Sequence, residues 1–289
     1  MKMAERRHPD WIKVRASSSP EYLRTRALLT ELKLHTVCQE AGCPNIGECF
    51  SNRTATFMLM GDVCTRNCPY CAVTHGRARP LDADEPRRIA AAIARLDLQH
   101  VVVTSVDRDD LPDGGAAHFA ATAVAIKVLS PDARVEVLVP DFKGAHTSVE
   151  TVVESPVEIY NHNIETVPSL YRKCRPGGRY EISLDVLAHA KATARGRGRE
   201  LLTKAGIMLG LGEERDELMR TLADLRGVGC DILTLGQYLQ PSRDHLPVAR
   251  YVTPAEFAEI KTDALALGYR HVESGPLVRS SYHAWAHVN

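Results

Sequence analysis

The sequence predicts an α/β fold, a partial (βα)6 TIM-like barrel with extensions at both ends of the chain. From about residue 55, short apolar runs alternate with longer helical stretches, which is typical of a parallel sheet joined by right-handed crossovers. The apolar runs are continuous, as expected for strands that helices cover. Several runs end in polar clusters, and the carboxyl ends of barrel strands carry the active site. We therefore expect one shared site at that face of the barrel.

The barrel strands are expected at the short apolar runs, which are Thr56–Met60, His100–Val106, Arg134–Val139, Val157–Tyr160, Leu202–Leu209 and Ile232–Leu235. Helical periodicity places helices between them at Pro86–Leu96, Ala116–Leu129, Val149–Val153, Leu184–Ala194 and Arg215–Val228. A helix near residues 20–34, with Pro20 at its start, precedes the barrel. A last helix and strand, Pro254–Leu267 and His271–Glu273, follow it.

These elements divide the chain into three expected parts. Residues 1–52 form an N-terminal extension, residues 53–266 the barrel and residues 267–289 a C-terminal extension. The 36 basic and 36 acidic residues balance, so the net charge gives no sign of a nucleic-acid or membrane partner. No apolar run reaches about 18 residues, and the first residues lack the apolar core of a signal peptide. We expect a cytoplasmic enzyme.

Six of the eight cysteines fall into two triplets in the first quarter of the chain. The first triplet has the spacing C-x4-C-x5-C and the second C-x3-C-x2-C, and the members are Cys38, Cys43 and Cys49, then Cys64, Cys68 and Cys71. Such tight groups in a chain without a secretion signal favour reduced, metal-bound thiolates over disulfides. A four-iron cubane takes four ligands, so three thiolates leave one iron for another group.

The second triplet fits other cysteine sites poorly. Zinc ribbons use paired C-x2-C hooks, disulfides would leave one cysteine over, and a fully ligated ferredoxin needs a fourth cysteine nearby. The triplet comes directly after the first barrel strand, and in that position its spacing resembles the signature loop of radical S-adenosylmethionine enzymes.

That resemblance implies a cofactor and its contacts. Three thiolates hold a [4Fe–4S] cluster, S-adenosylmethionine chelates the fourth iron, and one electron yields a 5′-deoxyadenosyl radical. The cofactor supplies the chemistry while the protein orients and protects it. Tyr70 resembles the aromatic residue near the adenine, and residues 206–213 look like the glycine-bearing strand that lines the cofactor. The cofactor-binding residues implied are Tyr70, Thr104, Asn163, Glu165, Gly210 and Gly212.

The first triplet resembles the auxiliary-cluster motif of lipoyl synthases. The resemblance extends over residues 104–115, 160–167, 236–242 and 279–282. It implies two [4Fe–4S] clusters, and a serine of the terminal motif as the fourth ligand of the auxiliary cluster. By position that serine is Ser281, with Ser280 as the alternative. An alkoxide is a hard ligand for iron beside soft thiolates, which suits a labile cluster.

The implied reaction inserts two sulfur atoms, at C6 and C8 of a protein-bound octanoyl-lysine, and consumes the auxiliary cluster. The implied partners are octanoylated lipoyl domains or the glycine-cleavage H protein, a reductant such as flavodoxin or ferredoxin, and an iron–sulfur carrier for cluster repair. None of the histidines forms a metal or triad pattern in the sequence.

Three alternatives fit less well. An electron-transfer protein would ligate both clusters completely, a methylthiotransferase carries a larger N-terminal domain and a basic module, and biotin synthase draws its second set of ligands from barrel strands. Cys174 and Cys230 have no partner at ligand spacing, and we expect both to be buried apolar residues. The neighbouring Lys173 and Arg175 leave a lowered pKa open for Cys174.

Overall fold

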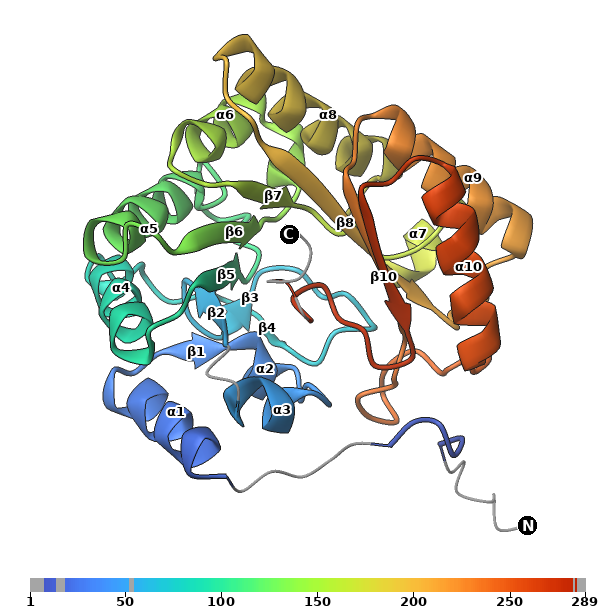
Figure 1. The fold of residues 1–289 in the computed structure, drawn as a ribbon, viewed down its shortest axis with the longest axis horizontal. Helices are drawn as coiled ribbons and strands as arrows, with labels where there is room; N and C mark the ends of the chain where they lie inside the picture. Colours follow the sequence, from blue (N-terminus) through green and yellow to red (C-terminus); the bar gives the residue numbers. More distant parts are fainter. Residues whose placement is uncertain (1–7, 14–18, 52–54, 283, 285–289) are drawn as a thin grey trace.

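An eight-stranded sheet organises the chain in the computed structural model, which describes residues 8–13, 19–51, 55–282 and 284. From edge to edge it consists of β1 (His35–Thr36), β2 (Thr56–Leu59), β5 (His100–Ser105), β6 (Arg134–Leu138), β7 (Ile159–Asn161), β8 (Leu202–Leu209), β9 (Ile232–Gln237) and β10 (His271–Gly275). The strands from β2 to β10 are parallel, and β1 pairs antiparallel with β2. The sheet curves into an open arc (Figure 1).

Helices surround the outer face of this arc (Figure 1). They are α4 (Glu85–Leu96), α5 (Ala116–Leu129), α6 (His146–Glu154), α8 (Tyr180–Gly196), α9 (Arg215–Gly227) and α10 (Pro254–Ala266). Shorter elements are α2 (Val37–Glu40), α3 (Ile46–Ser51), β3 (Val63–Cys64), β4 (Thr74–His75), η1 (Phe142–Gly144) and α7 (Pro168–Cys174). Helix α1 (Pro20–Glu31) begins at a serine cap and packs on α3.

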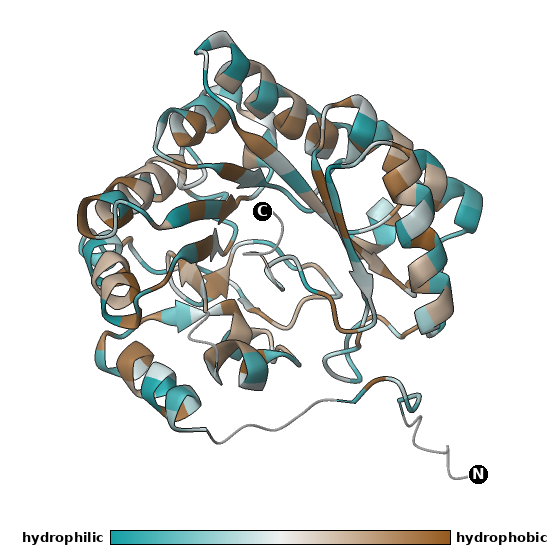
Figure 2. Cartoon of the chain, in the orientation of Figure 1, coloured by the Kyte–Doolittle hydropathy of each residue, from teal (hydrophilic) through white to brown (hydrophobic). Residues whose placement is uncertain are grey.

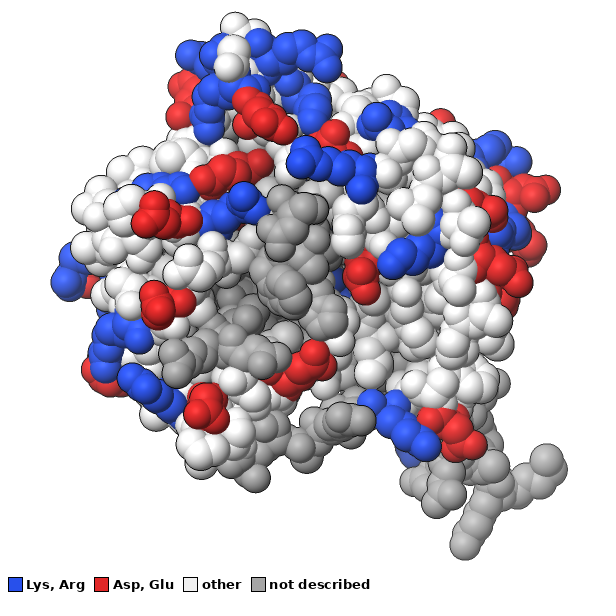
Figure 3. All heavy atoms as spheres, viewed as in Figure 1, with Lys and Arg blue, Asp and Glu red and all other residues white. Residues whose placement is uncertain are grey.

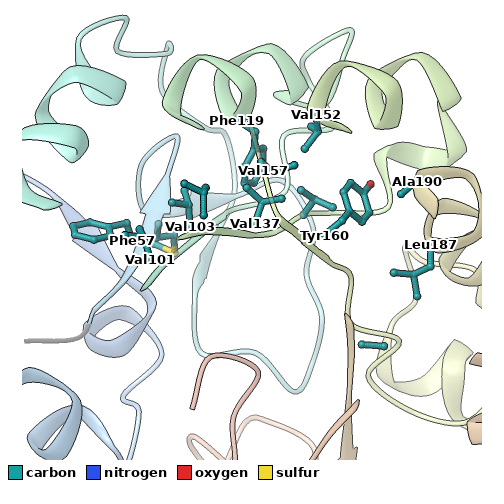
Figure 4. Close-up of a cluster of buried hydrophobic side chains, with 14 of the residues drawn as sticks. Phe57, Val101, Val103, Phe119, Val137, Val152, Val157, Tyr160, Leu187 and Ala190 are labelled. Atoms are coloured by element: carbon teal, nitrogen blue, oxygen red, sulfur yellow. The ribbon is translucent and has the colours of Figure 1, made fainter. Parts of the chain in front are cut away.

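The main core lies between the sheet and these helices. Figure 4 shows Val103 and Val137 of the strands facing Phe119 of α5 and Val152 of α6, and all four are buried. Removing such apolar surface from water is the main favourable term in folding. The outer turns of the helices carry both hydrophilic and hydrophobic residues (Figure 2), such as the exposed Val128 of α5, and charges of both signs are interspersed on the face shown in Figure 3. Within the described ranges, no helix has the length and apolar character needed to span a membrane.

The partial parallel barrel expected from the sequence is confirmed. The six predicted strands correspond to β2 and β5–β9, with ends that differ by two residues or fewer, and β10 extends the predicted 271–273 strand to Gly275. Strand β1 and helix α7 were not expected, because two paired residues or a seven-residue helix leave little periodic signal. The proposed boundary at residues 52 and 53 lies outside the described residues, as do the outermost parts of both extensions.

The division into three parts stays a prediction. Both expected extensions contribute strands to the barrel sheet, since β1 precedes residue 53 and β10 follows residue 267. After β10 the chain turns back towards the centre of the arc (Figure 1). This return brings the C-terminal segment, residues 276–282, against the inner face of the sheet, at β8 and β9.

Candidate iron–sulfur and S-adenosylmethionine site

The second triplet lies on the loop that follows β2. The chain leaves β2 through Met60, which adopts a left-handed backbone conformation (φ 68°). The Met60 N–H donates to the buried carboxylate of Glu85 at 2.8 Å, and the same oxygen lies 2.7 Å from Nε2 of His118. This fixed exit directs residues 61–75 across the carboxyl end of the barrel, where the parallel strand pair β3–β4 closes the loop.

Burial raises the pKa of the thiols of Cys64, Cys68 and Cys71 to about 11 in each case. Each thiol also feels the negative charge of another member of the triplet, which places the three sulfurs together. Three thiolates are therefore unfavourable here without a compensating positive charge, and bound iron supplies one.

A buried arginine clamps this loop to the barrel. Arg66, between the first two cysteines of the triplet, donates to both oxygens of Asp109 at 2.8 and 2.9 Å and to both oxygens of Asp141 at 2.9 and 2.7 Å. Paired arginine–carboxylate bonds of this kind are strong and directional. Burial opposes ionisation of Asp141, but Arg66 outweighs it and holds the pKa of Asp141 well below its usual range. The clamp joins the cysteine loop to the segments that follow β5 and β6.

Three of the predicted cofactor residues lie together beside the second triplet. The side chains of Asn163 and Tyr70 lie beside the Glu165 carboxylate and favour its charged form, and that charge acts on Cys68 and Cys71. Glu165 has a left-handed backbone (φ 69°) and pairs with Ile207 of β8 as an isolated bridge. Burial raises the pKa of Glu165 and that of Tyr70. Left-handed non-glycine residues often mark functional sites.

The other three predicted cofactor residues have structural contacts of their own. The Thr104 hydroxyl donates to the Leu138 carbonyl at 2.9 Å, within the sheet. A side chain at Gly210 would meet Nε2 of Gln237 at 2.2 Å, and both Gly210 and Gly212 have positive φ. Close packing and backbone conformation therefore account for these glycines, and cofactor contact at the three positions stays a prediction.

The first triplet is carried by the short helices beside the sheet edge. Cys38 lies on α2, Cys49 on α3 and Cys43 between them, and Thr36 caps α2. Burial raises the pKa of Cys38 to about 11 and of Cys49 to about 12, and it also raises the pKa of Cys43. The thiols again act on one another electrostatically, so they form a second group of three, in which Cys38 is buried and the other two are partly exposed.

The C-terminal segment docks on this first triplet. Thr56 of β2 donates from its hydroxyl to Oγ of Ser281 at 2.7 Å, and the same threonine lies beside the Cys38 thiol, whose rise in pKa it opposes. The Asn45 amide donates to the Leu277 carbonyl at 2.7 Å. One threonine thus separates Ser281 from a thiol of the first triplet.

Ser280 and Arg279 have different surroundings from Ser281. The Ser280 hydroxyl is bonded to the amide of Asn163, away from the first triplet. The Arg279 guanidinium favours the thiolate form of Cys43 by its charge. Burial lowers the pKa of Arg279, and the Cys43 thiol opposes that effect. This geometry favours Ser281 over Ser280 as the serine that reaches the first triplet.

Both groups of thiols suit iron–sulfur clusters. All eight cysteines are free. Among the described residues, no group of three His, Cys, Asp or Glu side chains closes around one metal ion. A cubane imposes a different geometry, because each thiolate binds its own iron, and soft thiolates are the ligands that such clusters use.

Sequence reasoning left out several residues that shape the two sites, namely Asn45, Thr56, Arg66, Asp109 and Asp141. Arg66 had a local signal, since it is a charged residue within the cysteine loop. Burial of Cys174 and Cys230 is confirmed, as both are fully buried. A lowered pKa for Cys174 is wrong, because burial raises it and outweighs the charge of Lys173.

Comparison with known proteins identifies the class. The family model of the Radical SAM superfamily matches residues 58–225. The chain resembles methylornithine synthase (TM-score 0.51, 15% identity, 86% of this chain and 81% of that one). It also resembles SuiB of Streptococcus suis bound to S-adenosylmethionine (TM-score 0.58, 11% identity, 81% and 55%). These likenesses show the fold, and with the family match they place the chain in the radical SAM superfamily.

Within that superfamily the chain is similar to lipoyl synthases over nearly its whole length. It is 57% identical over 279 residues to the lipoyl synthase of Methylococcus capsulatus (strain ATCC 33009 / NCIMB 11132 / Bath), covering 96% of this chain and 85% of the relative. Identity to that of Roseiflexus sp. (strain RS-1) is 53% over 283 residues, covering 98% and 93%. The chain belongs to the lipoyl synthase family.

Proposed function

We propose that this chain inserts two sulfur atoms, at C6 and C8 of an octanoyl group carried on a lysine of a lipoyl domain. The observation that carries the proposal is the pair of three-thiol groups, one on the loop at the carboxyl end of β2 and one beside Thr56 at its start. When bound, S-adenosylmethionine and the second-triplet cluster supply radical hydrogen abstraction, and the first-triplet cluster supplies the sulfur.

The second triplet provides the cofactor seat. Cys64, Cys68 and Cys71 bind three irons and leave the fourth for S-adenosylmethionine. Tyr70, Asn163 and Glu165 lie beside these cysteines and offer a ring, an amide and a carboxylate to the nucleoside. Arg66 holds the loop in place through its two carboxylate partners. Water is kept away because these groups are largely buried, which protects a reactive species.

The first triplet provides the sulfur store. Cys38, Cys43 and Cys49 bind three irons, and Ser281 binds the fourth through its oxygen. A serine oxygen is a poor match for iron beside three thiolates, so this iron is released more readily than the others. Thr56 orients Ser281 by donating a hydrogen bond to its oxygen.

The polar residues on the inner face of the sheet are not free to act as bases. Lys204 donates to Glu136 at 2.7 Å with both side chains fully buried, and the same carboxylate accepts from Asn161 at 3.0 Å. Burial opposes ionisation of Glu136, but Lys204 and His100 hold its pKa at about 2. A carboxylate held in this way is a weak base. Radical chemistry at unactivated C–H bonds needs no such base.

The proposal includes partners that the reaction requires. The octanoyl group comes on a lipoyl domain or on the glycine-cleavage H protein. A one-electron donor such as flavodoxin or ferredoxin reduces the second-triplet cluster. Because sulfur leaves the first-triplet cluster, an iron–sulfur carrier rebuilds it.

The test is anaerobic reconstitution with iron and sulfide, followed by reaction with an octanoyl-lysine peptide, S-adenosylmethionine and dithionite. Mass spectrometry of the peptide should show two added sulfur atoms, with two 5′-deoxyadenosines formed for each product. A reaction without S-adenosylmethionine is the control. Cleavage of S-adenosylmethionine with no sulfur in the peptide would contradict the proposal.

A further inference from the structure

A series of side-chain contacts leads from the second triplet to the C-terminal segment. Tyr70, which precedes the last cysteine of that triplet, lies beside the Glu165 carboxylate, and so does the side chain of Asn163; both oppose the rise in the pKa of Glu165 that burial causes. The Asn163 amide nitrogen donates to Oγ of Ser280 at 2.7 Å, and the Ser280 hydroxyl lies 2.9 Å from the amide oxygen. One asparagine therefore contacts both the predicted cofactor site and the C-terminal segment.

The series continues from Ser280 to the first triplet. The next residue, Ser281, accepts a hydrogen bond from Thr56 at 2.7 Å, and Thr56 lies beside Cys38. Ser280 and Ser281 thus face different triplets, although they are adjacent in the chain. A shift of Ser280 moves Ser281 as well, because one peptide unit joins them.

Two strand glycines form the seat on which this segment rests. A side-chain carbon at Gly236 of β9 would lie 2.1 Å from the Val278 carbonyl oxygen. At Gly206 of β8 it would lie 2.5 Å from Oδ1 of Asn163 and 2.9 Å from Oγ of Ser280. Neither glycine has a positive φ, so close approach of the segment, and not backbone conformation, is the reason that glycine suits these positions.

We propose that Ser280 and Asn163 form a latch that positions Ser281 at the first triplet and couples that position to binding of S-adenosylmethionine. The inference rests on the proposed function and adds two positioning roles to it. Asn163 is hydrogen-bonded to Ser280 and lies beside Glu165. A nucleoside that orders Glu165 and Asn163 leaves less freedom to be lost when Ser280 binds, so binding at one site strengthens the other. The coupling is reciprocal.

The C-terminal segment is then held at two places, by Ser281 at the first triplet and by the latch together with the glycine seat. With a cluster bound at the first triplet, the Ser281 oxygen would supply an exchangeable ligand to one iron, while Ser280 and the glycine seat keep the segment docked. Occupancy of the cofactor site thereby sets how firmly the fourth ligand is held.

Hydrogen exchange of the C-terminal segment in the holoenzyme tests the latch. The reporters are the amides of Val278 and Tyr282, which donate to the carbonyls of Gly275 at the end of β10 and of Arg279 within the segment. Saturating S-adenosylmethionine should slow exchange in the wild type by about fivefold, the effect of one hydrogen bond. Ser280→Ala should exchange about fivefold faster than wild type without the cofactor, and should not respond to it.

Two controls separate the latch from a general loss of packing. The Ser274 hydroxyl, also half-buried in this region, donates to the Phe257 carbonyl at 2.8 Å, and Ser274→Ala should respond to the cofactor as wild type does. Without the cofactor, Asn163→Ala should match Ser280→Ala, and the double variant should add nothing further. Mössbauer spectra should show less oxygen-ligated iron in Ser280→Ala than in Ser274→Ala.

If the hydrogen-exchange rate of the wild type does not change when S-adenosylmethionine is added, the coupling is wrong. Ser280→Ala exchange equal to wild type, or additive effects in the double variant, overturns the latch. The same wild-type preparation is assayed with the octanoyl-lysine peptide. If it adds two sulfurs while the exchange results fail, only the latch is wrong. If it adds none, the proposed function itself is wrong, whatever the exchange results are.

Discussion

The two cysteine triplets contain the same number of thiols but are held in different ways. The second triplet lies on one continuous loop, and Arg66 ties that loop to two carboxylates through four short hydrogen bonds. The first triplet lies on two short helices at the sheet edge, and the serine nearest to it comes from a position 225 residues beyond Thr56. One site is built locally and clamped, whereas the other depends on both ends of the chain.

This difference matches what each site has to do. A buried arginine with two carboxylate partners is costly to disrupt, so the loop that holds the cofactor cluster keeps its geometry through each reaction. The C-terminal segment is held by single hydrogen bonds, and each contributes about 1 kcal/mol. Contacts of that size open and reform readily. A site that has to lose a ligand and be rebuilt is served by the weaker arrangement.

The largest expected effect separates the two triplets by reaction. Replacing any cysteine of the second triplet by alanine should abolish both S-adenosylmethionine cleavage and lipoyl formation, because the cofactor loses its iron. Replacing any cysteine of the first triplet should abolish lipoyl formation and leave cleavage. Both products are measured by mass spectrometry on the same samples. Lipoyl product from a first-triplet variant would show that the two sites are not divided in this way.

Breaking the clamp should have the next largest effect. Arg66→Met leaves Asp109 and Asp141 only the more distant cations of Lys143 and Arg175, and loss of one member of a buried ion pair costs about 3–5 kcal/mol. We expect a lower free energy of unfolding in guanidinium chloride and loss of S-adenosylmethionine cleavage. The control is Arg87→Ala, which removes an exposed pair with Asp84 and should change neither. A fully active Arg66→Met variant would show that the clamp is dispensable.

Displacing the C-terminal segment should impair the first triplet more than the second. Gly236→Ala puts a methyl group within 2.1 Å of the Val278 carbonyl oxygen, and such overpacking costs about 1–3 kcal/mol. Lipoyl formation should fall to background while S-adenosylmethionine cleavage remains. Gly227→Ala, at a helical glycine with open space around it, should leave both reactions unchanged. Equal losses in the two reactions would mean that the segment supports both sites.

The smallest expected effect concerns the helix that carries Cys38. Thr36 caps α2 by accepting from the Gln39 N–H, and Thr36→Ala should cost about 1 kcal/mol. Lipoyl formation should be partly lost, with cleavage unchanged. Thr253→Ala removes the cap of α10, far along the chain from either triplet, at a similar cost. Both variants are compared by unfolding and by product yield, and a similar loss of lipoyl product in both would remove the link to α2.

Sequence patterns predicted the barrel because strand and helix periodicities are local. The six strands, the helices between them and both cysteine triplets follow from residues that are near one another in the chain. Tyr70, Asn163 and Glu165 were also predicted, through the resemblance to radical S-adenosylmethionine enzymes, and they lie together beside the second triplet. The two-residue strand β1 was not predictable, since its pairing with β2 depends on the rest of the fold.

The sequence by itself determined the parallel barrel, the two triplets and the chemistry that their thiols support, because each depends on spacing within a short stretch. Only the tertiary structure decided which carboxylates hold Arg66 and which of the two adjacent serines faces the first triplet. Ser280 and Ser281 are adjacent residues of the same type, so the sequence alone does not distinguish their contacts. They differ because folding places Asn163 beside one and Thr56 beside the other, across 117 and 225 residues of chain, and no local pattern encodes contacts over that distance.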